Sequence, residues 1–375
     1  MPPPVEFELH DSVDSLDAEG WDSLGDGHPA TSHVFLRALE KSACIGDAGG
    51  WAPRYLVGRR EGMPVAAVPL FLKSHSYGEY VFDWAWADAY HHHGLDYYPK
   101  WLVAAPFSPL PGTRIFARDD QARRSAIDAL CSIASQSGLS SLHVLFCNAD
   151  EARSLAAAGL LLRDGVQFHW INRGEADFDA FLARLNHDKR KKIRQERRKL
   201  ETWALDYRWH DGTTAGSADW DFFMRCYQGT YSAHHSTPYL NRDFFDRLAR
   251  DCPHSVRLLI ASRAGRPLAS AFFLASAEAL YGRYWGAVEP LPGLHFELCY
   301  YRPIAYCITH GLRRMEGGAQ GEHKMARGLE PVTTHSAHWI ADGRFRDALQ
   351  RHLALEGRHL DAYRSELEQR TPFRR

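Results

Sequence analysis

Lys324 is the residue whose neighbours best suit carbonyl chemistry. It follows a glycine-rich bend, Gly317-Gly318-Ala319-Gln320-Gly321. An ammonium at this place would stabilise the oxyanion that develops when a nucleophile attacks a carbonyl carbon. Glu322, His323 and Arg327 lie close by in sequence and are expected to bind substrate. On an alternating strand Glu322 and Lys324 would share one face and His323 would lie on the other. The alternative for Lys324 is a surface lysine paired with Glu322.

Three carboxylates could bind or activate an amine. Glu297 lies near the start of an expected helix, where it would act as a base, hold the amine, or only stabilise the helix dipole. Asp83 and Asp88 interrupt an aromatic run that extends from Tyr80 to Tyr90 and contains Trp86. Both either hold a substrate amine or make hydrogen bonds inside a core wall. The predicted catalytic residues are Lys324, Glu297 and Asp83.

A strongly basic segment extends from Arg184 to Lys199. It contains nine Lys and Arg residues and only two acids, so it carries a net charge of +7 against −8 for the rest of the chain. Apolar residues between Phe178 and Leu200 recur at near-helical spacing, which predicts one helix of about 23 residues with a docked apolar stripe. The basic face is either simply solvated or binds a polyanion such as RNA. The predicted polyanion-binding residues are Lys189, Arg190, Lys191, Lys192, Arg194, Arg197 and Arg198.

Several other kinds of chemistry lack support in the sequence. The seven cysteines are scattered and never form a C-x-x-C pair, which favours buried free thiols over disulfides or structural zinc. The three successive side chains of His91-His92-His93 point in different directions, which does not suit a single metal site. We therefore predict no metal and no resident cofactor. Nucleophile-elbow and Walker motifs are also absent, so hydrolase and NTPase functions are not indicated.

Composition indicates a globular protein of two domains. The chain has 375 residues, of which 45% are hydrophobic, 12% aromatic and 24% charged. Its formal net charge of −1 gives no overall field toward nucleic acid or an anionic membrane. The amino terminus lacks the features of a secretory signal, and the richest apolar stretch, Val65 to Leu72, is too short to cross a bilayer. We predict a cytoplasmic protein without stable membrane insertion.

Strand and helix patterns alternate in two similar halves. The first half predicts helices at 33–42, 122–137 and 149–158, and strands at 54–58, 64–73, 80–86, 141–146 and 165–172. The second half predicts helices at 218–232, 241–251 and 294–310, and strands at 204–210, 256–262, 267–275 and 279–288. A Gly-x-Pro-(Val/Leu)-Ala hairpin occurs once in each half, as Gly62–Ala66 and Gly265–Ala269. We infer two similar modules, at 1–174 and 201–375, joined by a basic segment at 175–200 that opens the second.

The basic segment and several later segments resemble the FemABX peptidoglycan-bridge aminoacyltransferases and, more closely, the bacterial FemAB-like predicted N-acyltransferases. The likeness extends from about Trp51 to His338 and is carried by the segments Phe181–Leu200, Leu72–Asp88, Tyr281–Gly286, Leu294–Tyr301 and Gly317–Lys324. Two departures stand out: the coiled-coil arm of many bridge enzymes is missing, and the Phe-Lys step of that family's late strand reads His323-Lys324 here.

The resemblance implies an α/β (α+β) fold of two tandem GNAT-like modules with mixed central sheets. It implies transfer of an acyl or aminoacyl group to an amine, with aminoacyl-tRNA as co-substrate and a peptidoglycan precursor or small metabolite as acceptor. Lys324 occupies the position of the family's late-strand lysine. The predicted substrate-binding residues are Asp88, Trp86, Arg283, Tyr284, Glu322, His323 and Arg327.

Two alternatives to the aminoacyl-tRNA donor remain open. An acyl-CoA-dependent N-acetyltransferase would need backbone amides at a strand-to-helix junction to hold the pyrophosphate. The segment Arg314–Ala319 matches the expected string but follows a helix, and the correctly placed junction, Val288–Gly293, contains two prolines and an acid. Acyl-CoA is therefore the less favoured donor. The other alternative is a non-catalytic RNA-binding or scaffold protein.

Overall fold

The chain divides into two compact units, which are described separately. The computed structural model describes residues 3–318 and 321–374, so Ala319 and Gln320 of the glycine-rich bend lie outside the described residues. Unit 1 contains residues 1–166 and 333–363, and unit 2 contains residues 167–332 and 364–375. Strands β9 (Leu161–Ile171) and β15 (Glu330–Ile340) each contain a unit boundary.

The two units differ from the domains predicted from the sequence in the placement of residues 333–363. The sequence assigned them to the second module, whereas they lie in unit 1. The reason is strand pairing, because β15 runs antiparallel to β8 (Ser141–Cys147), with His338 opposite His143. Periodicity predicts that a segment is a strand, but it does not name the partner of that strand.

Unit 1 contains two sheets. The first has the order β1-β3-β4-β7 and is antiparallel, and the second, within this unit, has the order β2-β5-β6-β8-β15, with β6 and β8 parallel and the other pairs antiparallel. The remaining strands are β1 (Glu6–His10), β2 (Trp51–Pro53), β3 (Tyr55–Arg60), β4 (Met63–Val68), β5 (Leu70–Lys73), β6 (Lys100–Val103) and β7 (Phe116–Ala117). The helices are α1 (Ala18–Leu24), α2 (His33–Lys41), α3 (Trp84–His92), α4 (Asp120–Gln136), α5 (Ala149–Ala157) and most of α12 (Gly343–Gln369).

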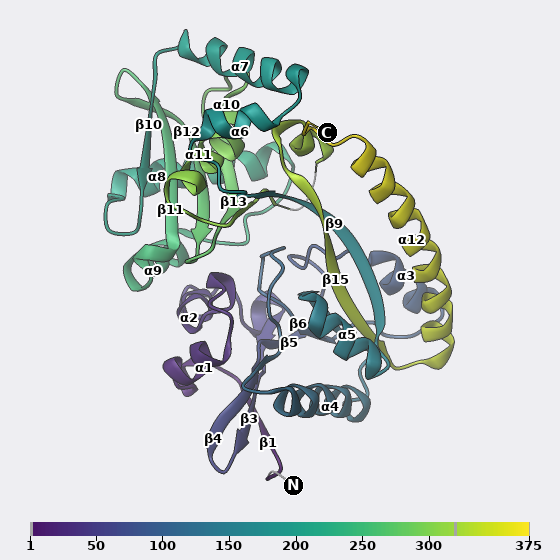
Figure 1. The fold of residues 1–375 in the computed structure, drawn as a ribbon. Helices are drawn as coiled ribbons and strands as arrows, with labels where there is room; N and C mark the ends of the chain where they lie inside the picture. The colour runs from purple at the N-terminus through teal and green to yellow at the C-terminus, as the bar shows by residue number, and fades with distance from the viewer. Residues whose placement is uncertain (1–2, 319–320, 375) are drawn as a thin grey trace. The chain divides into compact units, whose positions relative to one another are not determined.

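Helix α4 shows why the core of unit 1 forms where it does (Figure 1). The side chain of Asp119 accepts a hydrogen bond from the amide of Ala122, which caps the first turn. Buried apolar residues then recur at helical spacing and pack against Val65, Val68, Leu142 and Val144 of strands from both sheets. One amphipathic helix therefore covers apolar residues of both sheets.

The strand predicted for the aromatic residues at 80–86 is wrong, because helix α3 begins at Trp84. Aromatic residues favour strands by propensity. Here Trp86 and Tyr90 are four residues apart and share the buried face of α3, where they belong to a core cluster with Tyr97 and Ile340. The i, i+4 spacing was the signal for a helix.

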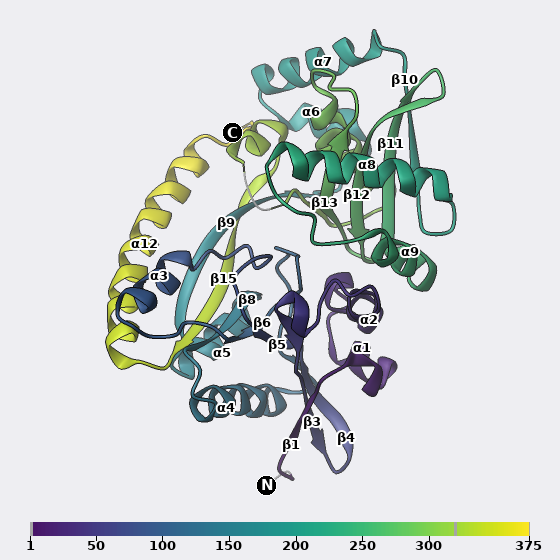
Figure 2. The same cartoon turned by 180° about the vertical axis from the view of Figure 1, so that it is seen from behind.

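Unit 2 is built on one mixed sheet. Within this unit its order is β10-β11-β12-β13-β14-β9, with β13 and β14 parallel and the other pairs antiparallel. Helices α8 and α9 cover one face of the sheet (Figure 2), and α11 packs on the other (Figure 1). The strands are β10 (Leu205–His210), β11 (Val256–Arg263), β12 (Arg266–Ala275), β13 (Ala279–Ala287) and β14 (Arg314–Glu316). The helices are α6 (Phe178–Arg184), α7 (His187–Glu201), α8 (Ser217–Ala233), α9 (Arg242–Asp251), α10 (Leu294–Phe296) and α11 (Arg302–Thr309).

The two hairpins predicted from the repeated Gly-x-Pro signature are present and share one irregularity. In β3 and β4 the register shifts beside the Arg59–Pro64 pair, and in β11 and β12 it shifts beside the Ser262–Pro267 pair. Proline has no N–H to donate to a ladder, so it suits a bulge. The same defect at the same place in both units supports two modules of common design. The predicted α/β class with a mixed sheet in each module is confirmed.

Candidate active site

A cavity opens in unit 2 where strands β13 and β14 separate. The two strands pair only over Ala279–Tyr281, opposite Arg314–Glu316, while β13 continues to Ala287. The chain after β14 turns away through Gly317 and Gly318. The cavity has a volume of about 250 Å³, and its lining is largely aromatic: Tyr227, Tyr231, Tyr284, Trp285, His295 and Tyr300. Backbone groups of β13 beyond Tyr281 face this side without a β14 partner among the described residues.

Two glycines in β13 make this arrangement possible. A side chain at Gly286 would collide with the backbone carbonyl of Cys226, so α8 packs directly on the strand. A Cβ at Gly282 would lie 3.1 Å from the carbonyl oxygen of Glu316, at the point where β13 and β14 part. The pairing of β12 with β13 shifts register between Phe272 and Phe273, which lie across from Tyr284 and Gly282, so Arg283 is the extra residue of a bulge in β13. Close packing and the bulge together shape the cavity.

One wall of the cavity is a π-helical segment, η5 (Glu297–Tyr301), inside the helix that the sequence predicted at 294–310. It separates α10 from α11 and contains two lining residues, Cys299 and Tyr300. Single π-helical turns are rare in proteins, and those that occur often lie at functional sites. Hydrophobic periodicity predicted the helix but gave no sign of the wider turn.

Lys324 lies beside this cavity on a 3-10 helix, η6 (Glu322–Arg327), and not on the expected strand. Its side chain is 3% exposed, and its ammonium Nζ donates to the carbonyl oxygen of Gly318, a lining residue, at 2.8 Å. Burial lowers the pKa of Lys324 to about 8. Glu322 instead binds Arg370 at 3.3 Å, so the alternative of a surface lysine paired with Glu322 is wrong.

The neighbours of Lys324 that were predicted to bind substrate occupy different places. His323 is exposed, and its Nε2 lies 3.1 Å from the hydroxyl of Tyr300 in the cavity wall. Arg327 is buried, with its guanidinium 3.4 Å from the centre of the Phe296 ring and 3.2 Å from the carboxylate of Glu196. Arg283 and Tyr284 both line the cavity. Their predicted substrate contacts stay predictions.

Glu297 is the first residue of the π-helical segment and is 2% exposed. Its carboxylate accepts two hydrogen bonds from Arg197, at 3.1 and 3.2 Å, and pairs with Arg302 at 3.2 Å. Together with Tyr207 these groups line a second hollow of about 260 Å³. The predicted role of Glu297 as a base or amine clamp stays a prediction, although two guanidinium groups already engage its carboxylate.

The basic segment is two helices and not one. Helix α6 ends at Arg184, and α7 begins after Asn186, whose side chain accepts a hydrogen bond from the amide of Lys189 at 3.0 Å. Lys191, Lys192, Arg194, Arg198 and Lys199 are exposed, and Lys189 and Arg190 are half-buried. Only Arg197 among the predicted polyanion-binding residues turns inward, because the buried carboxylate of Glu297 binds it.

Asp83 and Trp86 are buried in unit 1, where Asp83 belongs to a buried polar network and Trp86 packs against the rings of His143 and His338. The carboxylate of Asp83 binds the ammonium of Lys100 and accepts a hydrogen bond from the hydroxyl of Tyr97 at 2.6 Å. Burial alone would raise the pKa of Asp83, but Lys100 outweighs it and holds that pKa well below its usual range. This arrangement matches the hydrogen-bonded core wall that was the alternative for Asp83. Asp88 is exposed on α3.

Most residues of this network were not predicted from the sequence. Glu79 binds Lys100 at 2.9 Å, and burial raises the pKa of Glu79 to about 7. Burial lowers the pKa of Lys73, whose ammonium lies 4.0 Å from the centre of the Trp51 ring, to about 7 as well. A lysine inside an apolar strand, as in Leu70–Lys73, was the available signal, because a buried lysine needs a partner.

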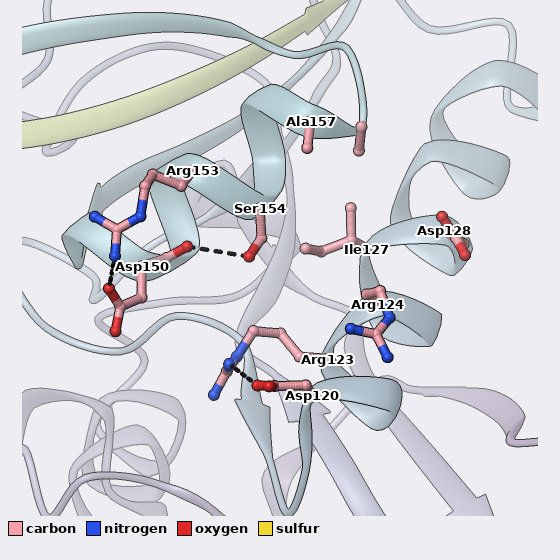
Figure 3. Close-up of a pocket in the computed structure, with 10 residues that line it drawn as sticks. Asp120, Arg123, Arg124, Ile127, Asp128, Asp150, Arg153, Ser154 and Ala157 are labelled. Carbon is pink, nitrogen blue, oxygen red and sulfur yellow. Dashed lines mark hydrogen bonds and ion pairs between the residues drawn. The ribbon is translucent and has the colours of Figure 1, made fainter.

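A hollow of about 600 Å³ in unit 1 lies between α4 and α5 (Figure 3). Arg123 pairs with Asp120 at 2.8 Å, and Arg153 pairs with Asp150. Arg124 and Asp128 also line it, so positive and negative groups balance. Without a net field this hollow is a weaker candidate than the cavity of unit 2.

Residues 3–318 and 321–374 contain neither a cluster suited to a metal ion nor a helix able to span a membrane. His, Cys, Asp and Glu side chains form no group of three there that is placed to hold a metal ion. His91, His92 and His93 are exposed at the end of α3. Every described helix is too short or too polar to span a bilayer.

The chain is similar to a known family in sequence and to solved structures in fold. The FemAB-like family model, described as peptidoglycan biosynthesis/recognition, matches residues 12–375. No curated protein matches the sequence. One similar solved structure is FemX, with a TM-score of 0.56 and 11% identity over 89% of this chain and 98% of that chain.

Two further structures have a similar fold. The C-terminal domain of a putative lysylphosphatidylglycerol synthetase from Agrobacterium fabrum has a TM-score of 0.54 and 12% identity, over 92% of this chain and 97% of that one. L-PGS from Bacillus licheniformis has a TM-score of 0.50 and 9% identity, over 91% of this chain and 96% of that one. At these identities the likeness concerns the fold alone, and the predicted α/β fold of two similar modules with mixed sheets is confirmed. Since the family model covers nearly the whole sequence, this protein belongs to the FemAB-like family.

Proposed function

We propose that the protein is an N-acyltransferase that moves an aminoacyl group from aminoacyl-tRNA to an amine on a peptidoglycan precursor or a small metabolite. Membership of the FemAB-like family supports an aminoacyltransferase-type function. The observation that carries the proposal is Lys324, a buried cation whose ammonium binds the carbonyl of a residue lining an aromatic cavity.

The chemistry follows from what such a cavity offers. A neutral acceptor amine attacks the carbonyl carbon of the aminoacyl ester, a C–N bond forms, and the ester C–O bond breaks. The proton released by the amine ends on the ribose hydroxyl that leaves with the tRNA. The ammonium of Lys324 stabilises the negative charge that develops on the carbonyl oxygen. With a pKa near 8, Lys324 is mostly protonated at neutral pH and can serve in this way.

The exposed face of α7 is the proposed contact for the donor. Lys191, Lys192, Arg198 and Lys199 are exposed and have no ion-pair partner among the residues the structure describes. Clustered cations of this kind release condensed counterions when they meet a nucleic acid backbone, so their contribution depends on salt. The same unit therefore contains a surface suited to tRNA and a cavity suited to its ester.

The alternatives are less well supported by the same region. The loop before α10 contains Pro290 and Pro292, which have no N–H for a pyrophosphate, and the carboxylate of Glu289 there pairs with Arg263 and Arg266. An acyl-CoA donor would therefore find few amides at the usual place. A pure RNA-binding protein would have no use for a buried lysine beside a cavity, since burial of an ammonium is unfavourable.

One experiment separates the three functions. The purified chain is incubated with a mixture of radiolabelled aminoacyl-tRNAs and a small-molecule fraction of cell extract, and in parallel with labelled acetyl-CoA. We expect label from aminoacyl-tRNA to appear in an amide product and Lys324→Ala to slow its formation by about 100- to 1,000-fold. Label from acetyl-CoA alone would replace the donor. Tight tRNA binding without product in either reaction would favour the RNA-binding alternative.

A further inference from the structure

The inner face of α7 holds both ends of the π-helical segment that forms one wall of the cavity. At the first end, Arg197 binds the carboxylate of Glu297 through two hydrogen bonds, at 3.1 and 3.2 Å. At the last end, the hydroxyl of Tyr301 donates to the carboxylate of the neighbouring residue, Glu196. The lining residue Cys299 lies between these two ends. Two consecutive residues of one helix therefore span the whole segment.

Glu196 also holds the helix that carries Lys324. The second carboxylate oxygen of Glu196 lies 3.2 Å from the guanidinium of Arg327, the last residue of η6. Arg327 in turn donates to the backbone carbonyl of His323 at 2.8 Å. The side chain of Arg327 is 6% exposed, so this ion pair is largely shielded from solvent. One carboxylate on α7 thus contacts both elements that carry the reactive side of the cavity.

We propose that Glu196 and Arg197 are positioning residues through which the basic helix sets the shape of the cavity. Contact of a polyanion with the outer face of α7 then changes the wall that contains Cys299 and Tyr300. The transmission to the cavity rests on the proposed function, because that function names tRNA as the polyanion. The clamp consists of the contacts of Glu196 with Tyr301 and Arg327 and of Arg197 with Glu297. All of them lie within unit 2 and do not depend on the proposed function.

The clamp fixes the orientation of η5 relative to α7. A bidentate guanidinium–carboxylate pair fixes orientation as well as distance, which a lysine ammonium does not. The carboxylate of Glu297 is 3% exposed, so removal of Arg197 would leave part of its buried charge uncompensated. A π-helical turn is uncommon in a helix, and side chains of α7 contact the first and last residues of this one. A movement of α7 should therefore displace η5 more than the rest of unit 2.

The test measures the alkylation rate of Cys299 by iodoacetamide, read by peptide mass spectrometry. Cys252, a half-buried cysteine at the end of α9 in the same unit, is the internal reference. We expect Arg197→Gln and Glu196→Gln to change the ratio of the Cys299 rate to the Cys252 rate by about fivefold or more. Arg197→Lys should fall between Arg197→Gln and the unaltered protein. The control is Arg208→Gln, which removes one exposed positive charge from β10 of the same unit, outside the clamp and the proposed tRNA contact, and should leave the ratio unchanged.

The second arm adds saturating uncharged tRNA. We expect tRNA to change the Cys299 rate in the unaltered protein and in Arg208→Gln, and to have no effect in Arg197→Gln. Simple shielding of the cavity by tRNA would slow alkylation equally in all three, and that result would refute transmission through the clamp. If tRNA does not bind at all, the proposed donor role fails together with transmission, while the alkylation ratios without tRNA still decide the clamp.

Two outcomes of the first arm would refute the clamp. One is an unchanged ratio in both Arg197→Gln and Glu196→Gln. The other is a parallel rise of the Cys252 rate, which would show general loosening of unit 2. A double-mutant cycle gives the supporting result: Arg197→Gln combined with Glu297→Gln should change the ratio no more than either single substitution, because both remove the same pair.

Discussion

At the scale of single residues, Lys324 offers the sharpest test of the mechanism. Lys324→Ala should lower kcat by about 100- to 1,000-fold, which is the effect of removing one oxyanion donor. Lys324→Met should have a similar effect on kcat without lowering Tm, because it replaces a buried ammonium by an apolar chain of similar length. Steady-state kinetics and thermal unfolding of both variants check this. Near-normal turnover in either would remove Lys324 from the mechanism.

The lowered pKa of Lys324 predicts a pH profile. The ammonium is required, so kcat should fall as pH rises through about 8, where Lys324 loses its proton. Below that pH the rate should rise with pH as the acceptor amine is deprotonated, which gives a bell shape. In Lys324→Ala the falling limb should disappear while the rising limb remains. A falling limb at the same pH in that variant would assign it to another group.

The same group has a linked effect on stability. Burial lowers the pKa of Lys324 from the ordinary value near 10.5 to about 8, so the unfolded chain binds more protons between these values. The contribution of Lys324 to the free energy of unfolding should therefore increase as pH rises from about 8 to about 10.5. Denaturant unfolding of the unaltered protein and of Lys324→Met over this range checks the sign. The difference between them should be largest at the low end.

At the scale of elements, α7 is the surface to test. The double substitution Lys191→Glu/Lys192→Glu should weaken tRNA binding and reduce the slope of log affinity against log salt by roughly 0.9 for each phosphate that is no longer neutralised. Both side chains are exposed, so Tm should change little. A matched double substitution in unit 1, Arg124→Glu/Arg358→Glu, makes the same change of charge on α4 and α12. Equal weakening by both pairs would indicate a general charge effect and not a site on α7.

At the scale of the whole molecule, the late return of the chain to unit 1 has a consequence for truncation. A chain that ends at Leu329 lacks β15, whose residues 335–340 pair with β8. Strand β8 then has no antiparallel partner. We expect faster hydrogen exchange in residues 141–147 and a tendency to aggregate, because an edge strand is then unprotected. A chain that ends at Gln369 keeps β15 and all of α12 and should exchange normally in β8. Normal exchange in the shorter chain would contradict the pairing.

Much of the local structure followed from the sequence. Periodicity and turn residues predicted α4, α5, α8, α9 and both Gly-x-Pro hairpins, because each depends on neighbours in the chain. The failures also have local causes. The aromatic run at Tyr80–Tyr90 was assigned as a strand by propensity, although its i, i+4 spacing indicates a helix. In the basic segment, the helix cap at Asn186 was not recognised among the charged residues around it.

The sequence by itself determined the family, the two-module α/β architecture and a cationic segment before the second module. Only the tertiary structure decided the site. It turned Arg197 inward onto Glu297, buried Lys324 beside the parted strands β13 and β14, and engaged Asp83 with Lys100. These partners are separated by 100, six and 17 residues along the chain. Spacing patterns report which face of an element is buried, whereas the partner of a buried charge depends on which elements pack together, and that is settled only by the folded chain.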